Sequence, residues 1–399
     1  MRYPSLRDAE LAGRRVFLRA DLNVPLKNGR VADDTRIRGV VPTIRLLLDR
    51  GASVVVASHL GRPGGTRNPE LSLAPVADRL EELLEMKVTF APDCIGARVN
   101  TLRASMKPGD VLILENLRFH PEEKEGDEGF ARQLAGNADI YVNDAFGTSH
   151  RAHASMVGVP GMLGGGYAGL LVQRELEIFD EMLSNPARPF TLVLGGAKVS
   201  DKIPVIDNLL PRLDHLLIGG GMAFTFMKEM GLEVGTSLLE LDRLGAARKI
   251  MDDAGEMGVE VLLPADIVVA PSTDRCDQAS TVPADSMPHQ ETGLDIGPGT
   301  VAAFGEVISG SSTVVWNGPM GVFEIPPFDS GTRGLASVMA EATEHGTFTV
   351  VGGGDSVRAV TEAGLEKRIS FVSTGGGASL KLLQGEELPA LAALKGART

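Results

Sequence analysis

The chain has 399 residues, 43% of them hydrophobic, and a formal net charge of −13, which is the composition of a globular protein. At this length two domains are expected, because one hydrophobic core rarely serves more than about 250 to 300 residues. The negative charge argues against nucleic acid and anionic membranes as partners, and no apolar run approaches the roughly 18 residues that cross a bilayer.

Charge is unevenly distributed along the chain. Residues 1–170 hold 22 Lys and Arg against 21 Asp and Glu, whereas the rest of the chain holds 17 against 31. The first part also contains 18 of the 28 arginines, whose planar guanidinium groups suit phosphate and carboxylate ligands. The two cysteines, Cys94 and Cys276, are too few for a disulfide framework, so we expect a reducing, cytoplasmic location.

The first half alternates short apolar runs with amphipathic stretches. Strands are predicted at 16–19, 53–57, 111–114 and 140–142, and helices at 37–49, 75–85, 97–106 and 128–135. Pro42 lies in the first of these helices, so its start is placed only to within a turn. The alternation is typical of a doubly wound domain with a parallel sheet.

A glycine-rich stretch at 161–166 precedes a helix predicted over 170–183, which we interpret as a connector between two halves. Strands near residues 190, 215, 260, 268, 314, 349 and 371 repeat the alternation beyond it. The predicted fold class is therefore α/β, with two doubly wound, Rossmann-like parallel-sheet domains joined by a connecting helix and hinge. The short apolar tail of the chain either caps the second domain or crosses back to the first.

Five strands of the second half run into glycine-rich turns. The first is PFTLVLGGAKVSDK at 189–202, where a short apolar run meets a glycine pair and Ser200 or Asp201 can cap the next helix. The others are LLIGGG at 216–221, VVWNGP at 314–319, VVGGGDS at 350–356 and FVSTGGGAS at 371–379. Exposed amides and helix N-termini at the carboxyl ends of parallel strands bind anions, so these turns predict a phosphate site.

Two glycine motifs are excluded as the source of this site. The dipeptide Gly-Lys is absent from the chain, so the site is not a P-loop. Residues 164–169 match G-x-G-x-x-G, but no predicted strand leads into them, and we expect no dinucleotide site there.

The loops that follow strands in the first half carry basic side chains. If the strands are parallel, these loops meet at one edge of the sheet and form a cationic bowl. Its expected members are Arg19, Arg36, His59, Arg62, Arg118 and Arg151, with His150 and His153. Asp21 and Asn23 could orient a hydroxyl, so the bowl suits a small ligand with phosphate and carboxylate groups.

In the second half, residues 352–356 end a strand and open a helix, which offers free amides to a polyphosphate. Asp355 suits Mg²⁺, although an aspartate here is also an ordinary helix N-cap. Lys198 and Lys202 add positive charge, and Glu324 could accept hydrogen bonds from a ribose.

Eight motifs bring these residues together: RADLNVP at 19–25, SHLGRP at 58–63, ENLRF at 115–119, SHRAHAS at 149–155, GGAKVSDKI at 195–203, WNGPMGVFE at 316–324, GGGDS at 352–356 and STGGGAS at 373–379. In this order they resemble phosphoglycerate kinase from about residue 2 to the C-terminus. Leu22 stands where the family commonly has phenylalanine, and Phe224 stands where it commonly has asparagine.

The resemblance implies reversible, Mg²⁺-dependent phosphoryl transfer between ATP and the carboxylate of 3-phosphoglycerate, giving 1,3-bisphosphoglycerate and ADP. On the family pattern the phosphoglycerate is held by Asp21, Asn23, Arg36, His59, Arg62, Arg118 and Arg151. The nucleotide is held by Lys202, Gly293, Glu324, Gly353, Gly354, Asp355 and Ser356, with Asp355 as the metal ligand. Arg36, Lys198, Gly375 and Gly376 are implied to meet at the transferring phosphoryl group.

The resemblance also implies a domain plan. Residues 1–170 would bind phosphoglycerate, 171–186 would form the connecting helix, and 187–385 would bind nucleotide. Residues 386–399 would pack back on the first domain. Such a protein is a monomer of glycolysis whose domains close over small-molecule substrates, with no nucleic acid or membrane partner.

The residues agree with this chemistry. A carboxylate nucleophile is ionised near neutral pH and needs no general base, and the sequence shows no triad-like constellation. Phosphoryl transfer requires in-line positioning and cations, for which Arg36 and Lys198 are candidates. Three alternatives remain: another kinase that forms acyl phosphates, a dehydrogenase, which would carry a glycine fingerprint after its first strand, and an inactive metabolite-binding module.

Overall fold

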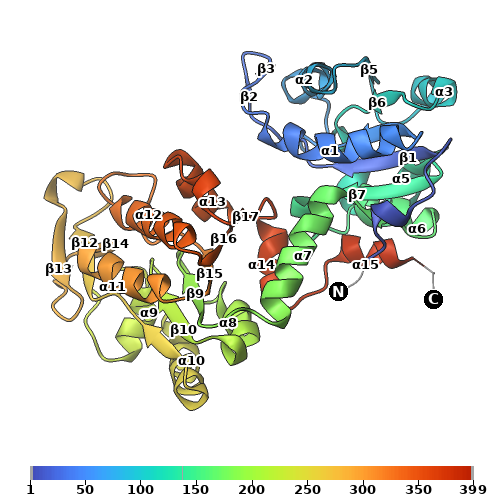
Figure 1. Cartoon of the computed structure of the whole chain (residues 1–399). Helices are drawn as coiled ribbons and strands as arrows, with labels where there is room; N and C mark the ends of the chain where they lie inside the picture. The colour runs from blue at the N-terminus through green and yellow to red at the C-terminus, as the bar shows by residue number, and fades with distance from the viewer. Residues whose placement is uncertain (1–2, 137, 397–399) are drawn as a thin grey trace. The chain divides into compact units, whose positions relative to one another are not determined.

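The structure, a computed structural model, describes residues 3–136 and 138–396, which divide into two compact units (Figure 1). The first unit contains the described residues up to Ile178 together with those from Glu387 onward, and the second is Phe179–Glu386. Within the described ranges, no helix is both long and apolar enough to span a bilayer.

The first unit is built on a six-stranded parallel sheet with strand order β5-β6-β4-β1-β7-β8. Its strands are β1 (Arg15–Ala20), β4 (Ser53–Ala57), β5 (Val88–Phe90), β6 (Val111–Ile113), β7 (Ile140–Asp144) and β8 (Tyr167–Ala168). Its helices are α1 (Thr35–Asp49), α2 (Ala74–Leu84), α3 (Ala97–Ser105), α4 (Glu122–Glu125), α5 (Glu128–Ala135) and α6 (Val159–Met162). Helix α1 continues through Pro42. The four predicted strands and four predicted helices are confirmed, whereas β5, β8 and the hairpin of β2 (Leu26–Lys27) and β3 (Arg30–Val31) were not predicted.

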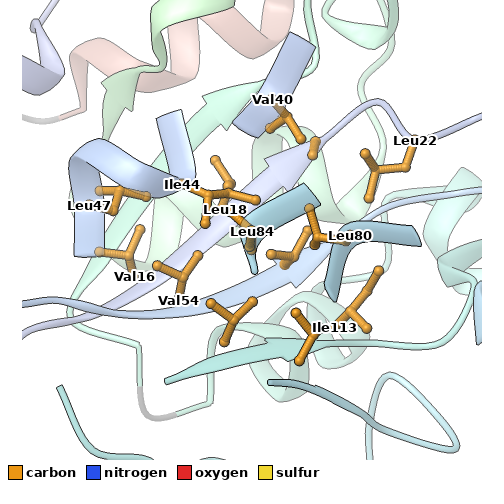
Figure 2. Packing of buried hydrophobic residues seen from close by; sticks show 14 of the residues in the cluster. Val16, Leu18, Leu22, Val40, Ile44, Leu47, Val54, Leu80, Leu84 and Ile113 are labelled. Carbon is orange, nitrogen blue, oxygen red and sulfur yellow. The ribbon is translucent and has the colours of Figure 1, made fainter. Parts of the chain in front are cut away.

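Burial on both faces explains why the strands of this sheet are continuously apolar. Successive strand residues point to opposite faces. In β1, Val16 and Leu18 pack with α1 and α2 (Figure 2), while Phe17 lies on the other face and stacks on Tyr141 at 6.0 Å between ring centroids. All four side chains are fully buried, as expected for a parallel sheet covered by helices on both sides.

The second unit repeats the plan with strand order β11-β10-β9-β15-β16-β17, again all parallel. The strands are β9 (Phe190–Leu194), β10 (His215–Ile218), β11 (Glu260–Leu262), β15 (Thr313–Asn317), β16 (Phe348–Gly352) and β17 (Phe371–Val372). The helices are α8 (Ile203–Leu209), α9 (Ala223–Glu229), α10 (Leu244–Met257), α11 (Pro298–Ser309), α12 (Ser330–Glu344), α13 (Gly354–Glu362) and α14 (Gly377–Leu383). The fold class predicted from the sequence is confirmed.

One predicted strand of the second half belongs elsewhere. The run near residue 268 forms β12 (Asp266–Ala270), which is the centre of a separate antiparallel sheet with β13 (Ser280–Pro283) and β14 (Thr292–Ile296). Only residues 263–265 separate β12 from β11, whereas a parallel neighbour requires a crossover of a dozen or more residues. The expectation that β12 continues the parallel alternation was therefore wrong.

The boundary between the units falls inside α7 (Leu170–Ser184), the predicted connecting helix (Figure 1). Buried Asp144 holds the start of this helix, because its Oδ1 accepts hydrogen bonds from the N–H groups of Leu171 at 2.9 Å and Val172 at 3.2 Å. The last helix, α15 (Pro389–Lys395), belongs to the first unit, where the N–H of Ala390 donates to the carbonyl of Ser149.

The cap of α7 predicts a pH dependence of stability. Burial raises the pKa of Asp144 from 3.8 to about 6, against the opposing hydrogen bonds from Thr43 and the helix N-terminus. The unfolded chain therefore ionises first as the pH rises, and this carboxyl lowers stability progressively between about pH 4 and pH 6. Asp144→Asn keeps an acceptor oxygen but does not titrate. Thermal unfolding should show the difference in Tm, variant minus wild type, rising over that interval and levelling off above it.

The exposed carboxyl of Asp49, at the end of α1, provides the control. Asp49→Asn should shift Tm by a small amount with no such trend. A pH-independent Tm difference for Asp144→Asn would contradict the assignment.

Candidate active site

The basic loops of the first unit begin at one edge of its sheet. In the register of the strands, Arg19 of β1 lies beside Ala57 of β4, and Ala20 lies beside Asp144 of β7. Parallel strands with matched ends release their loops on the same side, so the loops after β1, β4, β6 and β7 lie together as the sequence predicted.

Arg19 does not lie on the surface of this group. Its side chain is fully buried, Nε donates to Ser155 Oγ at 2.9 Å, and Nη2 lies 3.1 Å from His59 Nδ1. The remaining nitrogen, Nη1, donates to the carbonyl of Ala20. Because all its nitrogens are occupied, the prediction that Arg19 lines the bowl was wrong. It supports the loops from below instead.

A buried carboxylate accompanies Arg19. Glu123 in α4 is fully buried and accepts from Ser155 Oγ at 2.6 Å and from the Ser155 N–H at 2.9 Å. Burial raises the pKa of Glu123, and the charge of Arg19 and the two hydrogen bonds from Ser155 oppose the shift. Ser155 therefore joins a buried cation to a buried anion, which is the arrangement that makes burial of charge tolerable.

Above this network the predicted ligand residues contact one another. Arg36 Nη1 lies 3.1 Å from Asp21 Oδ2 and donates to the carbonyl of Asn23 at 3.2 Å. Asn23 Oδ1 accepts from the N–H of Gly61 at 2.8 Å, and Arg118 Nη1 donates to the carbonyl of the same glycine at 2.9 Å. The structure thus brings residues from three separate loops to one place.

Electrostatics confirm this convergence. The pKa of buried His59 lies well below its usual value, first because of burial and then because of Arg19, Arg118 and Arg36. The pKa of His153 falls to about 4, again through burial and then the charges of Arg19, Arg118 and Arg151. Both imidazoles are therefore neutral near pH 7, which leaves the arginines as the cations of this surface.

Two further members of the predicted bowl are exposed. Arg151 follows β7, and its charge acts on Arg118 as well as on His153. Arg62 directly follows Gly61, the glycine bonded to Arg118, and its side chain is exposed. We call the set of Asp21, Asn23, Arg36, His59, Arg62, Arg118 and Arg151 the arginine pocket.

The second unit carries two adjoining cavities at the carboxyl ends of its strands. The first, of about 340 Å³, is largely apolar and is lined by Phe224, Leu238, Gly293, Asp295 and Glu324 among others. Gly293 in β14 faces the ring of Phe224 so closely that a Cβ atom would collide with it. Gly293 therefore makes room for Phe224, the residue that departs from the common family pattern.

The second cavity, of about 660 Å³, is less apolar than the first and shares Gly196, Ala197, Pro319 and Asp355 with it. Its walls include these predicted residues: Lys198, Lys202, Gly353, Gly354, Asp355, Ser356 and Gly376. Gly375 is not among them. It is buried and its N–H donates to Ser373 Oγ at 3.1 Å, whereas the next two glycines, Gly376 and Gly377, line the cavity.

The source of the free amides differs from the prediction. The N–H groups of Gly195 and Gly196 donate to the carbonyls of Asn317 and Pro319, so this pair offers no donors to a ligand. Gly195 is required for another reason, because a Cβ there would collide with the carbonyl oxygen of Pro319. The prediction of exposed amides at this turn was therefore wrong.

The first turn of α13 offers donors instead. Within the described part of the chain, no acceptor bonds to the N–H groups of Gly354, Asp355 or Ser356, as is usual for a helix N-terminus. Gly353 adopts φ +91°, a conformation that favours glycine, and turns the chain from β16 into this helix. An open space adjoins Gly354, since a Cβ there would meet no atom within 4 Å.

Lys202 and Asn317 form a pair beside this turn. Lys202 Nζ donates to Asn317 Oδ1, while buried Asn317 Nδ2 has no partner among the described residues. Burial lowers the pKa of Lys202, and the charges of Asp201 and Asp355 oppose the shift. The ammonium and the orphaned amide are thus poised to bind oxygen atoms.

The predicted helix cap at 200–201 was also wrong. Helix α8 starts at Ile203 with Lys202 at the N-cap position and no side-chain cap. Ser200 Oγ donates instead to Glu240 Oε1 at 2.7 Å. The carboxylate of Glu240, 40 residues further along the chain, therefore binds the hydroxyl that was expected to cap the helix. A local sequence pattern cannot predict a contact between residues so far apart in the chain.

Several residues of the site had no sequence signal. Glu123 lies in the acidic run PEEKEGDE, whose composition is typical of a solvent-exposed segment. Asn317 lies in VVWNGP, where the prediction rests on the glycine-containing turn and not on the asparagine. Asp295 lines the first cavity while accepting N–H bonds from Gly331 at 2.6 Å and Ile296 at 2.9 Å. Burial raises the pKa of Asp295 to about 8, against those two bonds.

A family model for phosphoglycerate kinase matches residues 6–386. The chain belongs to this family. It is 50% identical over 397 residues to phosphoglycerate kinase of Chloroherpeton thalassium, covering 100% of both chains, and 51% identical over 391 residues to cytosolic phosphoglycerate kinase of Triticum aestivum, covering 98% and 97%. The structure of phosphoglycerate kinase from Coxiella burnetii matches with a TM-score of 0.86 and 39% identity, covering 99% of each chain.

Membership of the phosphoglycerate kinase family settles the class of function. The protein is a kinase of glycolysis that acts on a carboxylate acceptor, with ATP or ADP and small molecules as substrates. The dehydrogenase alternative is excluded. The G-x-G-x-x-G match follows helix α6, and its glycines pack closely, with Gly166 against Tyr141 and Gly169 against Asp144.

The contact between Gly293 and Phe224 predicts a compensating pair of mutations. Gly293→Ala should lower the Tm by several degrees, because overpacking a buried site costs about 1 to 3 kcal/mol. Phe224→Leu shortens the opposing side chain, so the double variant should lose less than the two single changes added together. Thermal unfolding of the four proteins measures this coupling. Strict additivity would contradict the packing described here.

Proposed function

We propose that the protein catalyses direct, in-line, Mg²⁺-dependent phosphoryl transfer between ATP and the carboxylate of 3-phosphoglycerate, giving 1,3-bisphosphoglycerate and ADP. One observation supports the proposal: the carboxyl edge of each unit's own parallel sheet carries groups suited to anions, arginines in the first unit and free backbone amides with lysines in the second. The 1–170 part would bind phosphoglycerate, 171–186 would connect, and 187–385 would bind the nucleotide.

The arginine pocket suits phosphoglycerate because it combines several guanidinium groups with two residues that can orient a hydroxyl. Arg62 and Arg151 are exposed and can turn toward a phosphate, whereas Arg118 is half-buried and already fixed on Gly61. Asp21 and Asn23 hold Arg36 from one side. Because Nδ1 of neutral His59 must accept from the guanidinium of Arg19, its Nε2 carries the proton and can donate to an anion.

The cavities of the second unit suit a nucleotide. The apolar cavity next to Gly293 and Phe224 can take the base, and exposed Glu324 at its rim can accept from ribose hydroxyls. The adjoining cavity is lined by the free amides of 354–356, Lys202 and Asn317 with its orphaned amide, all of which favour phosphate oxygens.

The residues also fit a magnesium ion. Asp355 lines both cavities, so it lies between the cavity proposed for the base and the cavity proposed for the phosphates. One carboxylate beside a polyphosphate is the usual protein contribution to a Mg²⁺ site. When bound with the nucleotide, the ion would neutralise phosphate charge and help to orient the phosphates.

The mechanism needs no general base from the protein, because the attacking carboxylate is already ionised. Arg36 and Lys198 would stabilise the charge of the transferring phosphoryl group, together with the amide of Gly376. Buried Gly375, whose N–H is bonded to Ser373, would contribute only by shaping the turn that positions Gly376. Two unit charges about 4 Å apart at an effective dielectric near 20 interact by roughly 4 kcal/mol. A few such contacts supply much of the lowering of the barrier.

Arg36 and Lys198 belong to different units, so both reach one phosphoryl group only if the units close over their substrates. Closure would also exclude water, which would otherwise hydrolyse the acyl phosphate. We infer that α7, which contains the boundary between the units, is part of the hinge.

We further propose that the enzyme acts as a monomer in the cytoplasm. Within the described ranges, only four large apolar side chains are exposed, Met230, Leu238, Leu241 and Met257. Cys94 and Cys276 are both free thiols, as expected in a reducing compartment.

A coupled assay with MgATP and 3-phosphoglycerate tests the reaction, and variants of two exposed residues test the mechanism. Arg36→Ala or Lys198→Ala should lower kcat by about 10²- to 10³-fold, as removal of other charged transition-state donors does. Both side chains are exposed, so the Tm should change little. The exposed pair Arg45→Ala and Lys249→Ala controls for loss of surface charge. A kcat unchanged in the folded Arg36 or Lys198 variants would remove that residue from the mechanism.

The division of labour between the units makes a second kinetic prediction. Lys202→Ala and Glu324→Ala should raise the KM for the nucleotide several-fold and leave the KM for 3-phosphoglycerate close to wild type. These residues line only cavities of the second unit. An effect confined to phosphoglycerate would contradict the assignment.

A further inference from the structure

Three potential metal-binding side chains form a cluster in the first unit that the proposed kinase reaction does not use. Asp93 and Cys94 lie in the loop between β5 and α3, and His120 follows the segment after β6. One ligand atom from each, a carboxylate oxygen, Sγ and an imidazole nitrogen, lies within 4.8 Å of the other two. We call these three residues the Asp–Cys–His cluster.

The distances between the three ligand atoms are close to those around a bound metal ion, so only small side-chain movements would be needed for coordination. A tetrahedral Zn²⁺ with bonds of about 2.0 to 2.3 Å places its ligand atoms about 3.3 to 3.8 Å apart. Asp93 Oδ1 and His120 Nε2 now lie 2.7 Å apart as a hydrogen-bonded pair, so they would open by less than about 1 Å. Shifts of this size are available to side chains on loops without refolding of the sheet.

Two of the ligands are already oriented. The N–H of Cys94 donates to Asp93 Oδ1 at 2.7 Å, which fixes the carboxylate over the thiol of the next residue. The ring of His120 packs on Phe130 with centroids 5.2 Å apart, and this restricts its rotation. Both contacts are local and would persist around a bound ion.

The cluster is closed on one side and open on the other. Cys94 is completely buried, whereas the side chains of Asp93 and His120 are 42% and 24% exposed. An ion could therefore enter from solvent past the carboxylate and the imidazole and reach the thiol beneath. Three protein ligands would leave a fourth position for water, as in open zinc sites.

The donor set identifies the class of ion. Sulfur with imidazole nitrogen disfavours Mg²⁺ and Ca²⁺, which take oxygen ligands, and favours borderline transition-metal dications. Two carboxylates, Asp93 and the buried Glu123, interact with Cys94 and would attract a cation. The guanidinium of buried Arg103 acts in the opposite direction.

We propose that Asp93, Cys94 and His120 form a binding site for a transition-metal dication such as Zn²⁺. Binding replaces the hydrogen bond between His120 and Asp93. The neutral imidazole then carries its proton on Nδ1 and offers the lone pair of Nε2 to the ion, while the thiol of Cys94 loses its proton to solvent as the metal–thiolate bond forms. The ion would tie the loop after β5 to the segment after β6, two neighbouring strands of the sheet. Because a thiol must lose its proton to bind the ion, affinity should rise with pH.

Cobalt titration of the full-length, chelator-treated and reduced protein tests this site. Co²⁺ should bind at one equivalent and produce a thiolate-to-cobalt charge-transfer band in the near ultraviolet, and equimolar Zn²⁺ should abolish the band. Cys94→Ser should remove the band, and His120→Asn should weaken Co²⁺ binding at least about 10-fold. Cys276→Ser is the control, because it removes the other cysteine of the chain and should leave the band unchanged.

Three results would overturn the proposal: no charge-transfer band with the wild type, a band that survives Cys94→Ser, or a band lost with Cys276→Ser. If buried Cys94→Ser does not fold, the more exposed Asp93→Asn and His120→Asn decide the question, because unchanged Co²⁺ affinity in both would also refute the site. Zn²⁺ should in addition raise the Tm of the wild type and not that of His120→Asn. These readouts are independent of kinase activity, so failure here leaves the proposed reaction untouched.

Discussion

The buried network of Arg19, Ser155 and Glu123 is the interaction on which the arginine pocket of the first unit depends. Removing a guanidinium and a carboxylate from water costs free energy. The hydrogen bonds that Arg19 and Glu123 each form with Ser155 offset part of this cost. In return, β1, α4 and the loop after β7 are held in one arrangement. The exposed arginines above them are therefore presented to a ligand from a fixed base.

Arg19 also affects the neighbouring imidazoles. Burial first, and then the charge of Arg19, lowers the pKa of both His59 and His153, so neither becomes a competing cation near pH 7. The second unit combines two lysines, Lys198 and Lys202, with backbone N–H groups. There, the strand ends at Gly195 and Pro319 approach so closely that no side chain fits, and the first turn of α13 carries the free donors.

Much of this could be predicted from sequence, for identifiable reasons. Strands buried on both faces, such as Ser53–Ala57, are continuous apolar runs, and residues at their carboxyl ends share one edge by topology alone. Residue type does not reveal burial or partners, however. Arg19 and Arg36 look alike in sequence, yet one lies beneath the pocket and the other on its surface.

Long-range competition explains the remaining errors. The apolar run of β12 gave no sign of its antiparallel partners, and the amides of Gly195 and Gly196 are taken by residues more than 100 positions away. Glu123, Asn317 and Asp295 act through contacts that exist only after folding. The family motifs contain the residues proposed to bind ligands and also the supports Arg19, Ser155 and Asn317, but a motif does not show which of its residues are buried.

Calorimetric titration of the full-length protein with 3-phosphoglycerate, without nucleotide, tests the arginine pocket most directly. Binding should be one to one, should weaken as potassium chloride is raised, and should be at least about 10-fold tighter than binding of glycerate, which lacks the phosphate. Equal affinity for the two acids, or binding indifferent to salt, would contradict an anion site built from these arginines.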